Sequence, residues 1–257
     1  MNRARPDLGD VTLVAVSSIA LPGTVAALER SVEQAAFGQV LLLSDIRPDL
    51  PPGKKIQWQQ IEPLRSRSDY SRFMLRELAS HICTSHVLCI QWDGFVLNGE
   101  AWDPGFLKYD YIGAVWPQFS DSHNVGNGGF SLRSRRLIEA CRELPFDGAE
   151  AEDIVIARRS RRRLEQDGIR FAPESVARAF AYERTRPSGS EFGFHGASNL
   201  VRYLTPTQAR DLFASLEPGV LAASENKEIL RWAIAKGQGR LALTMLSRWL
   251  RASSKGR

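Results

Sequence analysis

Short apolar runs alternate with stretches of helical periodicity along the first part of the chain. Residues 11–16 ("VTLVAV"), 39–45 ("QVLLLSD") and 86–93 ("HVLCIQWD") have the length and apolar content of strands that are buried on both faces. Residues 21–38 and 69–82 place apolar side chains three and four positions apart, which predicts an amphipathic helix in each of these segments. Strands and helices in this alternating order predict a parallel sheet with right-handed crossovers.

The remaining chain predicts shorter elements and then a helical end. A short strand is expected at residues 55–61, a helix at 152–166, and two further short strands at 169–173 and 175–183. From Leu200 onward the periodicity is helical to the last residue. We therefore expect one α/β domain at residues 1–204 and a helical, basic C-terminal extension at residues 205–257.

The composition is that of an ordinary globular chain of 257 residues, of which 43% are hydrophobic and 25% are charged. No apolar stretch approaches the length of about 20 residues that spans a bilayer. The charged N-terminus is followed by an apolar run, residues 11–16, that is too short for the core of a signal peptide. These features predict a cytoplasmic protein that can also associate peripherally with the inner membrane surface.

Charge and cysteine content narrow the classes of partner. The formal net charge is +5, and part of the arginine excess is concentrated at residues 133–136 and 158–166. Such a basic surface suits nucleic acid, anionic lipid or phosphorylated small molecules, or it is a solvated helix face. No recognised nucleic-acid-binding motif accompanies the charge, so nucleic acid is not expected as a partner. Cys83, Cys89 and Cys141 are odd in number and lack CxxC spacing, which predicts reduced thiols.

Asp93 is the first candidate for chemistry. It ends the apolar run at residues 86–93 and is followed at once by Gly94, so the local sequence fits an ordinary strand exit with an Asp-Gly turn. It also fits a carboxylate that is placed to hold a ligand. Because open parallel sheets bind ligands beyond the carboxyl ends of their strands, the position of Asp93 favours the second interpretation.

The glycine-rich segment at residues 126–130 ("GNGGF") is the second candidate. It lacks the Lys-Ser/Thr of a P-loop, and it precedes a strand-like stretch instead of a helix. Glycines at this spacing indicate either a tight turn or a backbone that approaches a ligand closely. In the second case the segment would be a platform for a sugar or a phosphate, with Asn127 as a polar contact.

Two further positions carry residues of a suitable chemical type. Glu152 and Asp153 stand at the start of a predicted helix, where acidic side chains commonly act as caps, although a carboxylate there can also be a general base towards a hydroxyl. His195 lies in "FGFHG", and imidazole is a common ligand of divalent metals. A lone histidine is more often structural, and no pair of histidines has the spacing of a zinc hydrolase.

The order of five motifs resembles a known family. "QWDGFVLNGEAW", "FLKYDYIGAVW", "GNGGFSLRS", "EDIVIAR" and "FGFHG" resemble the DUF5672 family, a bacterial group related to glycosyltransferases, and the resemblance runs from about residue 11 to Gly196. It implies a GT-A-like fold, which is a Rossmann-type mixed sheet, mostly parallel and flanked by helices, that binds a nucleotide-sugar. The sequence has no GxSxG elbow, no kinase motif set and no GxGxxG after the first strand, which weakens three other enzyme classes.

The same resemblance implies a divalent metal, Mn²⁺ or Mg²⁺, held on the donor diphosphate by a DxD-type motif at a strand end. Gln91, Trp92, Asp93 and Gly94 occupy the place of that motif and are expected at the donor. Gln91 stands where the first acidic residue of such a motif would be. Asp93 is therefore the single carboxylate of the motif, and His195 is the candidate for the second metal ligand.

In inverting members of the GT-A class, a glycine-rich segment lines the donor sugar and the acceptor, and an acidic residue of a later motif is the base. By position, the residues expected to line the sugars are Asn127, Gly128 and Gly129. Asp153 or Glu152 would then deprotonate the acceptor hydroxyl, with Asp153 preferred on its place in the motif. Arg133 and Arg135 follow the glycine-rich segment and could contact phosphate, but we expect them at the solvated surface.

The C-terminal segment at residues 226–257 is basic and amphipathic. Its apolar residues at helical spacing include Leu241, Met245 and Trp249, and its interspersed arginines include Arg240, Arg248 and Arg251. A helix of this kind can lie in the interface of an anionic membrane, or it can pack on the domain with a solvated end. The first alternative would suit a lipid-linked acceptor in place of a free saccharide.

The leading hypothesis is a metal-dependent, inverting glycosyltransferase of bacterial cell-surface polysaccharide or glycoconjugate synthesis. It would move a sugar from a nucleotide-sugar, with a UDP-sugar favoured, to an acceptor hydroxyl. The alternative from another class is a non-catalytic nucleotide-sugar-binding or scaffold protein on the same fold, which Gln91 favours because it replaces an acidic residue. A basic nucleic-acid-binding domain is the third hypothesis.

Overall fold

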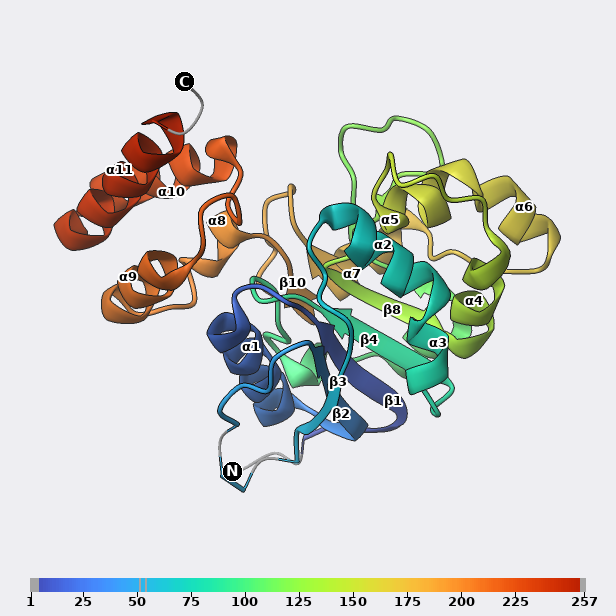
Figure 1. The fold of residues 1–257 in the computed structure, drawn as a ribbon. Helices are drawn as coiled ribbons and strands as arrows, with labels where there is room; N and C mark the ends of the chain where they lie inside the picture. Colours follow the sequence, from blue (N-terminus) through green and yellow to red (C-terminus); the bar gives the residue numbers. More distant parts are fainter. Residues whose placement is uncertain (1–4, 51, 54, 255–257) are drawn as a thin grey trace.

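The centre of the protein is a six-stranded sheet in the order β3-β2-β1-β4-β8-β5. A computed structural model describes residues 5–50, 52–53 and 55–254, and Figure 1 shows their arrangement. The strands of the sheet are β1 (Asp7–Val16), β2 (Ala36–Ser44), β3 (Gln57–Gln60), β4 (His86–Ile90), β5 (Tyr111–Ile112) and β8 (Phe130–Ser134). β1 to β4 pair in parallel, and β8 runs antiparallel between β4 and β5. The predicted α/β class with a mixed, mostly parallel sheet is confirmed.

Alternate side chains of the central strands enter two separate cores. In β1, Leu13 joins the larger core and Val14 joins the smaller one. The strand registers place Leu13 opposite Val40 of β2 and Leu88 of β4. Because successive side chains of a strand point to opposite faces, this burial is that of a sheet covered by helices on both sides.

Helices cover the two faces of the sheet as the cores require. α1 (Leu21–Gln34) packs in the larger core, whereas α2 (Arg67–Arg76), α3 (Leu78–His81) and α4 (Arg135–Ala140) pack in the smaller core on the opposite face (Figure 1). The other helices before residue 205 are α5 (Glu152–Ile154), the π-helical η4 (Val155–Arg159), α6 (Arg161–Gln166), α7 (Glu174–Phe180), α8 (Ala197–Leu200) and the 3-10 helices η1 (Gly99–Ala101), η2 (Pro104–Lys108) and η3 (Cys141–Glu143). Two small sheets pair β6 (Ala114–Val115) with β7 (Val125–Gly126) and β9 (Ala181–Tyr182) with β10 (Gly193–Phe194).

The segment at residues 175–183 corrects one prediction. It was expected to be a strand, but most of it is the helix α7, and only its end is the short strand β9. Ala177 and Phe180 stand three residues apart and are both fully buried, which is the spacing of one helix face. The neighbouring strand predicted at residues 169–173 is reduced to a single bridge between Phe171 and Tyr111.

Two predicted helices differ from expectation, one in its C-terminal end and the other in its regularity. The helix expected at residues 21–38 ends at Gln34, because Ala35 is extended and leads directly into β2. The helix expected at residues 152–166 begins and ends as predicted, but the π turn of η4 interrupts it. In this turn the Ser160 N–H donates to the Val155 carbonyl at 2.9 Å. The remaining predicted strands correspond to β1 to β4.

The C-terminal end of the chain is helical, as predicted. α9 (Pro206–Ser215), α10 (Ala223–Ala235) and α11 (Gly239–Ser254) lie to one side of the sheet (Figure 1). Phe213, Ile229 and Met245, one from each helix, are fully buried in the same core that contains α1. The predicted boundary at residue 205 coincides with the N-cap of α9, but the core is continuous across it. A separate domain beginning at this point therefore stays a prediction.

α11 is amphipathic with an exposed apolar side. Leu241 and Met245 are buried, whereas Leu243 is 67% exposed and Leu250 is 56% exposed. Within the described residues, no helix combines the length and the apolar content that crossing a membrane would need.

Candidate functional site

Asp93 lies in a tight turn that follows β4. The Gly94 N–H donates a hydrogen bond to the Gln91 carbonyl at 3.1 Å, and the Asp93 carbonyl accepts one from the Gly196 N–H at 3.1 Å. A Cβ atom on Gly94 would lie 2.6 Å from the carbonyl oxygen of Phe194, so this close approach requires glycine. The turn leaves the Asp93 side chain buried at the carboxyl end of the strand.

His195 stands against this turn and contacts three of the surrounding side chains. Its Nε2 atom is 3.2 Å from Asp93 Oδ1 and 3.2 Å from Gln91 Oε1. Its Nδ1 atom is 3.3 Å from Glu183 Oε1. The structure therefore brings three predicted site residues together and adds a fourth, Glu183, that the sequence analysis did not identify.

Two short strands place Glu183 and His195 side by side. Glu183 follows β9 and His195 follows β10, and these strands pair in parallel with Tyr182 opposite Phe194. The His195 N–H continues this pairing by donating to the Tyr182 carbonyl at 3.0 Å. A lone acidic residue at the end of an apolar segment is the signal that identified Asp93, and the same signal would have identified Glu183.

The charges around His195 favour its protonated form. Burial alone would lower the pKa of the imidazole, but the carboxylates of Asp93 and Glu183 outweigh burial and raise this pKa well above its ordinary value of 6.5. Burial would raise the pKa of Glu183, but the hydrogen bond and charge of His195 hold it below its ordinary value of 4.5. An imidazolium is therefore held between two carboxylates.

One oxygen atom of this group has no hydrogen bond. Asp93 Oδ1 is buried and accepts no hydrogen bond from the described part of the chain. Its contact with His195 Nε2 at 3.2 Å is an ion pair without hydrogen-bond geometry. Because a buried carboxylate oxygen without a donor is unfavourable, this atom is available to a ligand or a cation.

The glycine-rich segment passes next to His195. Asn127 has a φ of 79°, and its Oδ1 accepts hydrogen bonds from the N–H groups of Gly129 (2.8 Å) and Phe130 (3.1 Å). Its Nδ2 atom is 3.2 Å from His195 Nδ1. The side chain of Asn127 thus holds its own left-handed backbone in place and turns the segment into β8.

The two central glycines are fitted between side chains. A Cβ atom on Gly128 would lie 2.2 Å from Glu152 Oε1, and one on Gly129 would lie 2.0 Å from His195 Nε2. Both distances are far below van der Waals contact, so neither position accepts a side chain without displacing a charged group. The sequence suggested either a tight turn or a backbone that approaches a ligand closely. At Gly128 and Gly129 the backbone does approach other atoms closely, but these atoms belong to the side chains of Glu152 and His195.

Glu152 is buried against the glycine-rich segment, next to Gly128. Its Oε1 atom accepts a hydrogen bond at 3.0 Å from Arg133, whose side chain is 0% exposed. Burial and the charge of Asp153 raise the pKa of Glu152 above its ordinary value of 4.5, against the opposing effect of Arg133. The expectation that Arg133 is at the surface is wrong, whereas Arg135 is 41% exposed and pairs with Glu139.

Asp153 is the more accessible of the two adjacent carboxylates, since its side chain is half-buried. Its Oδ2 atom accepts a hydrogen bond from the Gly128 N–H at 3.0 Å, and its Oδ1 accepts one from the Ile154 N–H at 2.8 Å. The carboxylate is thus oriented by backbone donors at the edge of the glycine-rich segment. This is the arrangement that a positioned base needs.

Trp92, unlike its neighbours Gln91 and Asp93, packs in the larger core and not against His195. It is 9% exposed and belongs to the larger core, where a Cβ atom on Gly23 of α1 would lie 3.4 Å from the Trp92 Cβ. The other predicted positions, which are Gln91, Asp93, Gly94, Asn127, Gly128, Gly129, Asp153 and His195, lie at the carboxyl end of β4 or in contact with residues there.

The donor atoms of the site fit a cation only in part. Asp93 Oδ1 is buried without a hydrogen bond. His195 Nε2 lies 3.2 Å from this oxygen and 3.2 Å from Gln91 Oε1. Oxygen and imidazole ligands suit Mn²⁺ and Mg²⁺. Among the residues that the structure describes, however, no group of three or more His, Cys, Asp or Glu side chains is arranged to hold a metal ion. Protein ligands would therefore leave most positions of the cation to a substrate and to water.

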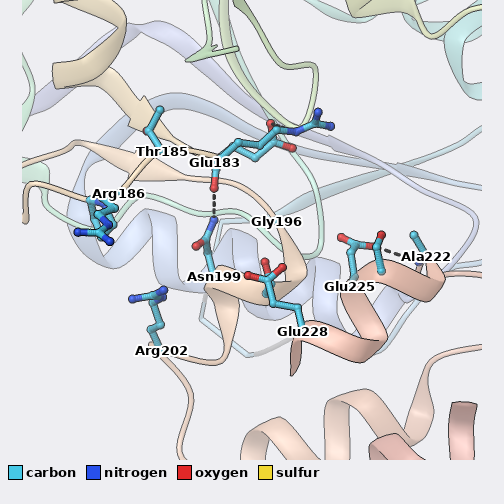
Figure 2. Close-up of a pocket in the computed structure, with 13 residues that line it drawn as sticks. Glu183, Thr185, Arg186, Gly196, Asn199, Arg202, Ala222, Glu225 and Glu228 are labelled. Atoms are coloured by element: carbon cyan, nitrogen blue, oxygen red, sulfur yellow. Dashed lines mark hydrogen bonds and ion pairs between the residues drawn. The ribbon is translucent and has the colours of Figure 1, made fainter. Parts of the chain in front are cut away.

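A polar cleft of about 950 Å³ opens beside Glu183 (Figure 2). The residues that line it come from the segment after β9, from α8 and from the start of α10, and they are Glu183, Arg184, Thr185, Arg186, Pro187, Gly196, Ser198, Asn199, Arg202, Ala222, Ser224, Glu225 and Glu228. Glu183 is shared between the cleft and the contacts of His195. The sequence analysis identified none of the arginines of this cleft.

Two solved structures are similar to this chain. A glycosyltransferase involved in the glycosylation of the major capsid of PBCV-1 is 12% identical, with a TM-score of 0.46 over 72% of this chain and 92% of that chain. The galactosyltransferase LgtC, in complex with donor and acceptor sugar analogs, is 13% identical, with a TM-score of 0.43 over 84% of this chain and 99% of that chain. No curated protein sequence matches.

A family model gives the assignment of the sequence. The model described as "Protein of unknown function (DUF5672)" matches residues 55–195. The matched range begins later than the predicted resemblance, at residue 55 and not at about residue 11, and it ends at His195. Since the match covers more than half of the 257 residues, the chain belongs to the DUF5672 family.

Proposed function

We propose that this protein is a glycosyltransferase that moves a sugar from a nucleotide-sugar to an acceptor hydroxyl. The observation that carries the proposal is the meeting of three features near the carboxyl end of β4, namely the Asp93–His195 pair, the bare backbone of Gly128 and Gly129, and the carboxylate of Asp153. They offer a site for a charged group and a base, and the two glycines let Glu152 and His195 pack directly against the backbone that joins these features.

Asp153 is the base in this proposal. Its half-buried carboxylate takes the proton of the acceptor hydroxyl while the hydroxyl oxygen forms a bond to the anomeric carbon. The bond from that carbon to the donor diphosphate breaks, and its electron pair leaves with the nucleoside diphosphate. Attack on the face opposite to the leaving group inverts the configuration. The Gly128 N–H at 3.0 Å keeps the carboxylate oriented.

Asp93 Oδ1 and His195 Nε2 would hold the divalent cation, Mn²⁺ or Mg²⁺. When bound, such a cation neutralises charge on the leaving diphosphate. His195 must lose a proton before its nitrogen can bind a metal, and the carboxylates of Asp93 and Glu183 oppose that loss by raising its pKa. We therefore expect the affinity for Mn²⁺ to increase as the pH rises.

The proposal includes a UDP-sugar donor and a saccharide or lipid-linked acceptor in bacterial cell-surface polysaccharide or glycoconjugate synthesis. It places the protein in the cytoplasm, with α11 in contact with the inner membrane surface. Leu243 and Leu250 are exposed on this helix and Arg240 is exposed at its start, a combination that suits anionic lipid. Co-sedimentation with anionic vesicles tests this contact, and it should be lost in a Leu243→Glu/Leu250→Glu variant. Equal sedimentation of the variant, or none of the natural chain, would refute it.

The activity is tested with UDP-glucose and UDP-galactose, using water in place of the unidentified acceptor. Asp153→Asn should slow hydrolysis of the accepted donor by about 10²–10⁴-fold while leaving the affinity for UDP unchanged. Asp93→Ala should remove the Mn²⁺-dependent part of UDP binding, measured by titration calorimetry. Asp167→Asn, which changes an exposed carboxylate at the end of α6, is the matched control and should behave like the natural chain. Hydrolysis that is unchanged in Asp153→Asn would remove this residue from the mechanism.

A non-catalytic nucleotide-sugar-binding or scaffold protein is the second candidate. Gln91 stands where a second carboxylate would hold a metal, and the described residues contain no cluster of three metal-binding side chains of the His, Cys, Asp or Glu type. For this alternative we expect UDP to bind while neither donor is hydrolysed by the natural chain or by Asp153→Asn. Donor hydrolysis that depends on Asp153 would exclude it.

A further inference from the structure

The cleft beside Glu183 has walls from three parts of the chain (Figure 2). Asn199 of α8 fixes two of these walls to each other, because its Nδ2 donates hydrogen bonds to the carbonyls of Glu183 at 2.7 Å and of His195 at 2.8 Å. The third wall is the first turn of α10, which contributes Glu225 and Glu228. The cleft is therefore a fixed extension of the site around His195, and it is not a gap between independent parts.

Three arginines line this cleft. Arg184 is close to a carboxylate, with its Nε atom 3.5 Å from Glu183 Oε2. Arg186 and Arg202 are exposed and form no ion pair with any residue that the structure describes. Figure 2 shows both side chains toward one end of the cleft and Glu225 toward the other.

Two guanidinium groups that line one cleft, and that form no ion pair with a residue the structure describes, form a site for an anion. Guanidinium donors match the oxygens of phosphate in pairs, which a single ammonium group cannot do. None of the three acidic side chains of the cleft forms an ion pair with Arg186 or Arg202 among the described residues. Glu183 contacts His195 and Arg184, Glu225 accepts the Ala222 N–H at 2.9 Å, and Glu228 is exposed.

We propose that this cleft binds a phosphate-bearing ligand, with the phosphate on Arg186 and Arg202 and with the carboxylates of α10 facing hydroxyl groups of the same ligand. The inference rests on the proposed function, in which a phosphate can come from two sources. It is either the diphosphate of the nucleotide-sugar or a phosphate carried by the acceptor. Both present the same oxygens to the arginines, and the experiment below separates them.

The C-terminal extension is part of this site. Burial raises the pKa of Glu225, and the charges of Asp93 and Glu183 raise it further, so this side chain lies in the electrostatic field of the predicted centre. Glu225 and Glu228 belong to α10, which follows the predicted boundary at residue 205. Binding of the ligand would thus join the sheet region to the extension.

The experiment uses the full chain and four probes, which are UDP, uridine, glucose 1-phosphate and inorganic pyrophosphate. Titration calorimetry compares the natural chain with an Arg186→Ala/Arg202→Ala variant. Loss of hydrogen bonds to a charged group weakens binding by about tenfold for each arginine. The control variant is Arg162→Ala/Arg163→Ala, which removes the same charge from exposed positions of α6, away from the cleft. Circular dichroism and the unfolding midpoint establish that each variant is folded.

If the phosphate comes from the donor, UDP and pyrophosphate bind about a hundredfold more weakly to the cleft variant, and uridine binds as before. If it comes from the acceptor, glucose 1-phosphate loses affinity and UDP does not. Either result supports the proposal when the control variant is unaffected. Equal affinities of the natural chain and the cleft variant for all four probes would overturn it. Dependence of donor hydrolysis on Asp153 is read separately, so the proposed function can stand when this inference fails.

Discussion

The Arg133–Glu152 pair and the His195–Asp93–Glu183 group lie on the two sides of one pair of glycines. Gly128 faces Glu152 and Gly129 faces His195, so the backbone between the two groups has no side chain to separate them. Each group combines a cation with carboxylates at close distance, 3.0 Å in the first and 3.2 and 3.3 Å in the second. They differ in their surroundings, since the first is closed on all sides and the second borders a cleft.

This difference separates a structural use of charge from a chemical one. In the first group Arg133 is fully buried, and it donates from Nε to Ser131 and from Nη2 to Glu152, while its Nη1 has no hydrogen-bond partner among the described residues. In the second group His195 is 15% exposed and Asp93 Oδ1 has no hydrogen bond. Each group contains one buried polar atom without a hydrogen bond, so it is burial and the neighbouring cleft that predict different roles for similar residues at similar distances.

The largest expected effect is on the closed group. Glu152→Ala leaves the Arg133 charge buried without its partner, which should lower the free energy of unfolding by about 3–5 kcal/mol. Unfolding in guanidinium chloride measures the loss. A Glu152→Met/Arg133→Met variant, which removes both charges, should recover much of that stability. A loss below about 1 kcal/mol in Glu152→Ala, the range typical of an exposed pair, would show that this group is not closed.

The second effect concerns Gly129, one of the two glycines between the groups. Gly129→Ala places a Cβ atom 2.0 Å from the present position of His195 Nε2, so the imidazole must move. We expect a destabilisation of about 1–3 kcal/mol from overpacking, together with loss of Mn²⁺-dependent UDP binding. Gly239→Ala is the matched control, because a Cβ atom there meets no atom within 4 Å. Unchanged UDP binding in Gly129→Ala would mean that the position of His195 does not matter for the ligand.

The smallest expected effect is a dependence of stability on pH in the metal-free protein. The pKa of His195 is raised in the folded state, so its contribution to stability is complete below about pH 6.5 and is lost as the pH rises through the folded-state value. The midpoint of unfolding should fall over this range, and it should fall less in His195→Gln. Asp93, Glu183, Gln91 and Asn127 are the groups that face the imidazole. Equal slopes for the two proteins would contradict the charged imidazolium.

The sheet and part of the candidate site around Asp93 could be predicted from the sequence. The strands β1, β2 and β4 are continuous apolar runs, and such runs have few alternatives to burial in a parallel sheet. Asp93 was identifiable because strand order alone places the end of β4 at the ligand-binding edge. His195 was singled out because Gly193 and Gly196 flank it, whereas its contact with Gly129 could not be foreseen from the local sequence.

Other features depend on contacts that the local sequence does not contain. Arg133 belongs to an arginine-rich stretch that is typical of a surface, and only its pairing with Glu152, nineteen residues away, explains its burial. Glu183 ends its segment as Asp93 does, but only the pairing of β9 with β10 brings it beside His195, and the local sequence does not contain that pairing. Arg186 and Arg202 face one cleft only because α8 folds back against the segment after β9.

The family match ends at His195, whereas the wall that faces Arg186 across the cleft begins at Ala222. Although the helical end packs in the same core as α1, the first turn of α10 can vary without altering Asp93, Asp153 or the glycines. Mutations in the first turn of α10 would then change which substrate is selected and would leave the chemistry intact. For protein engineering, this makes residues 222–228 the first segment to randomise when a new substrate is wanted.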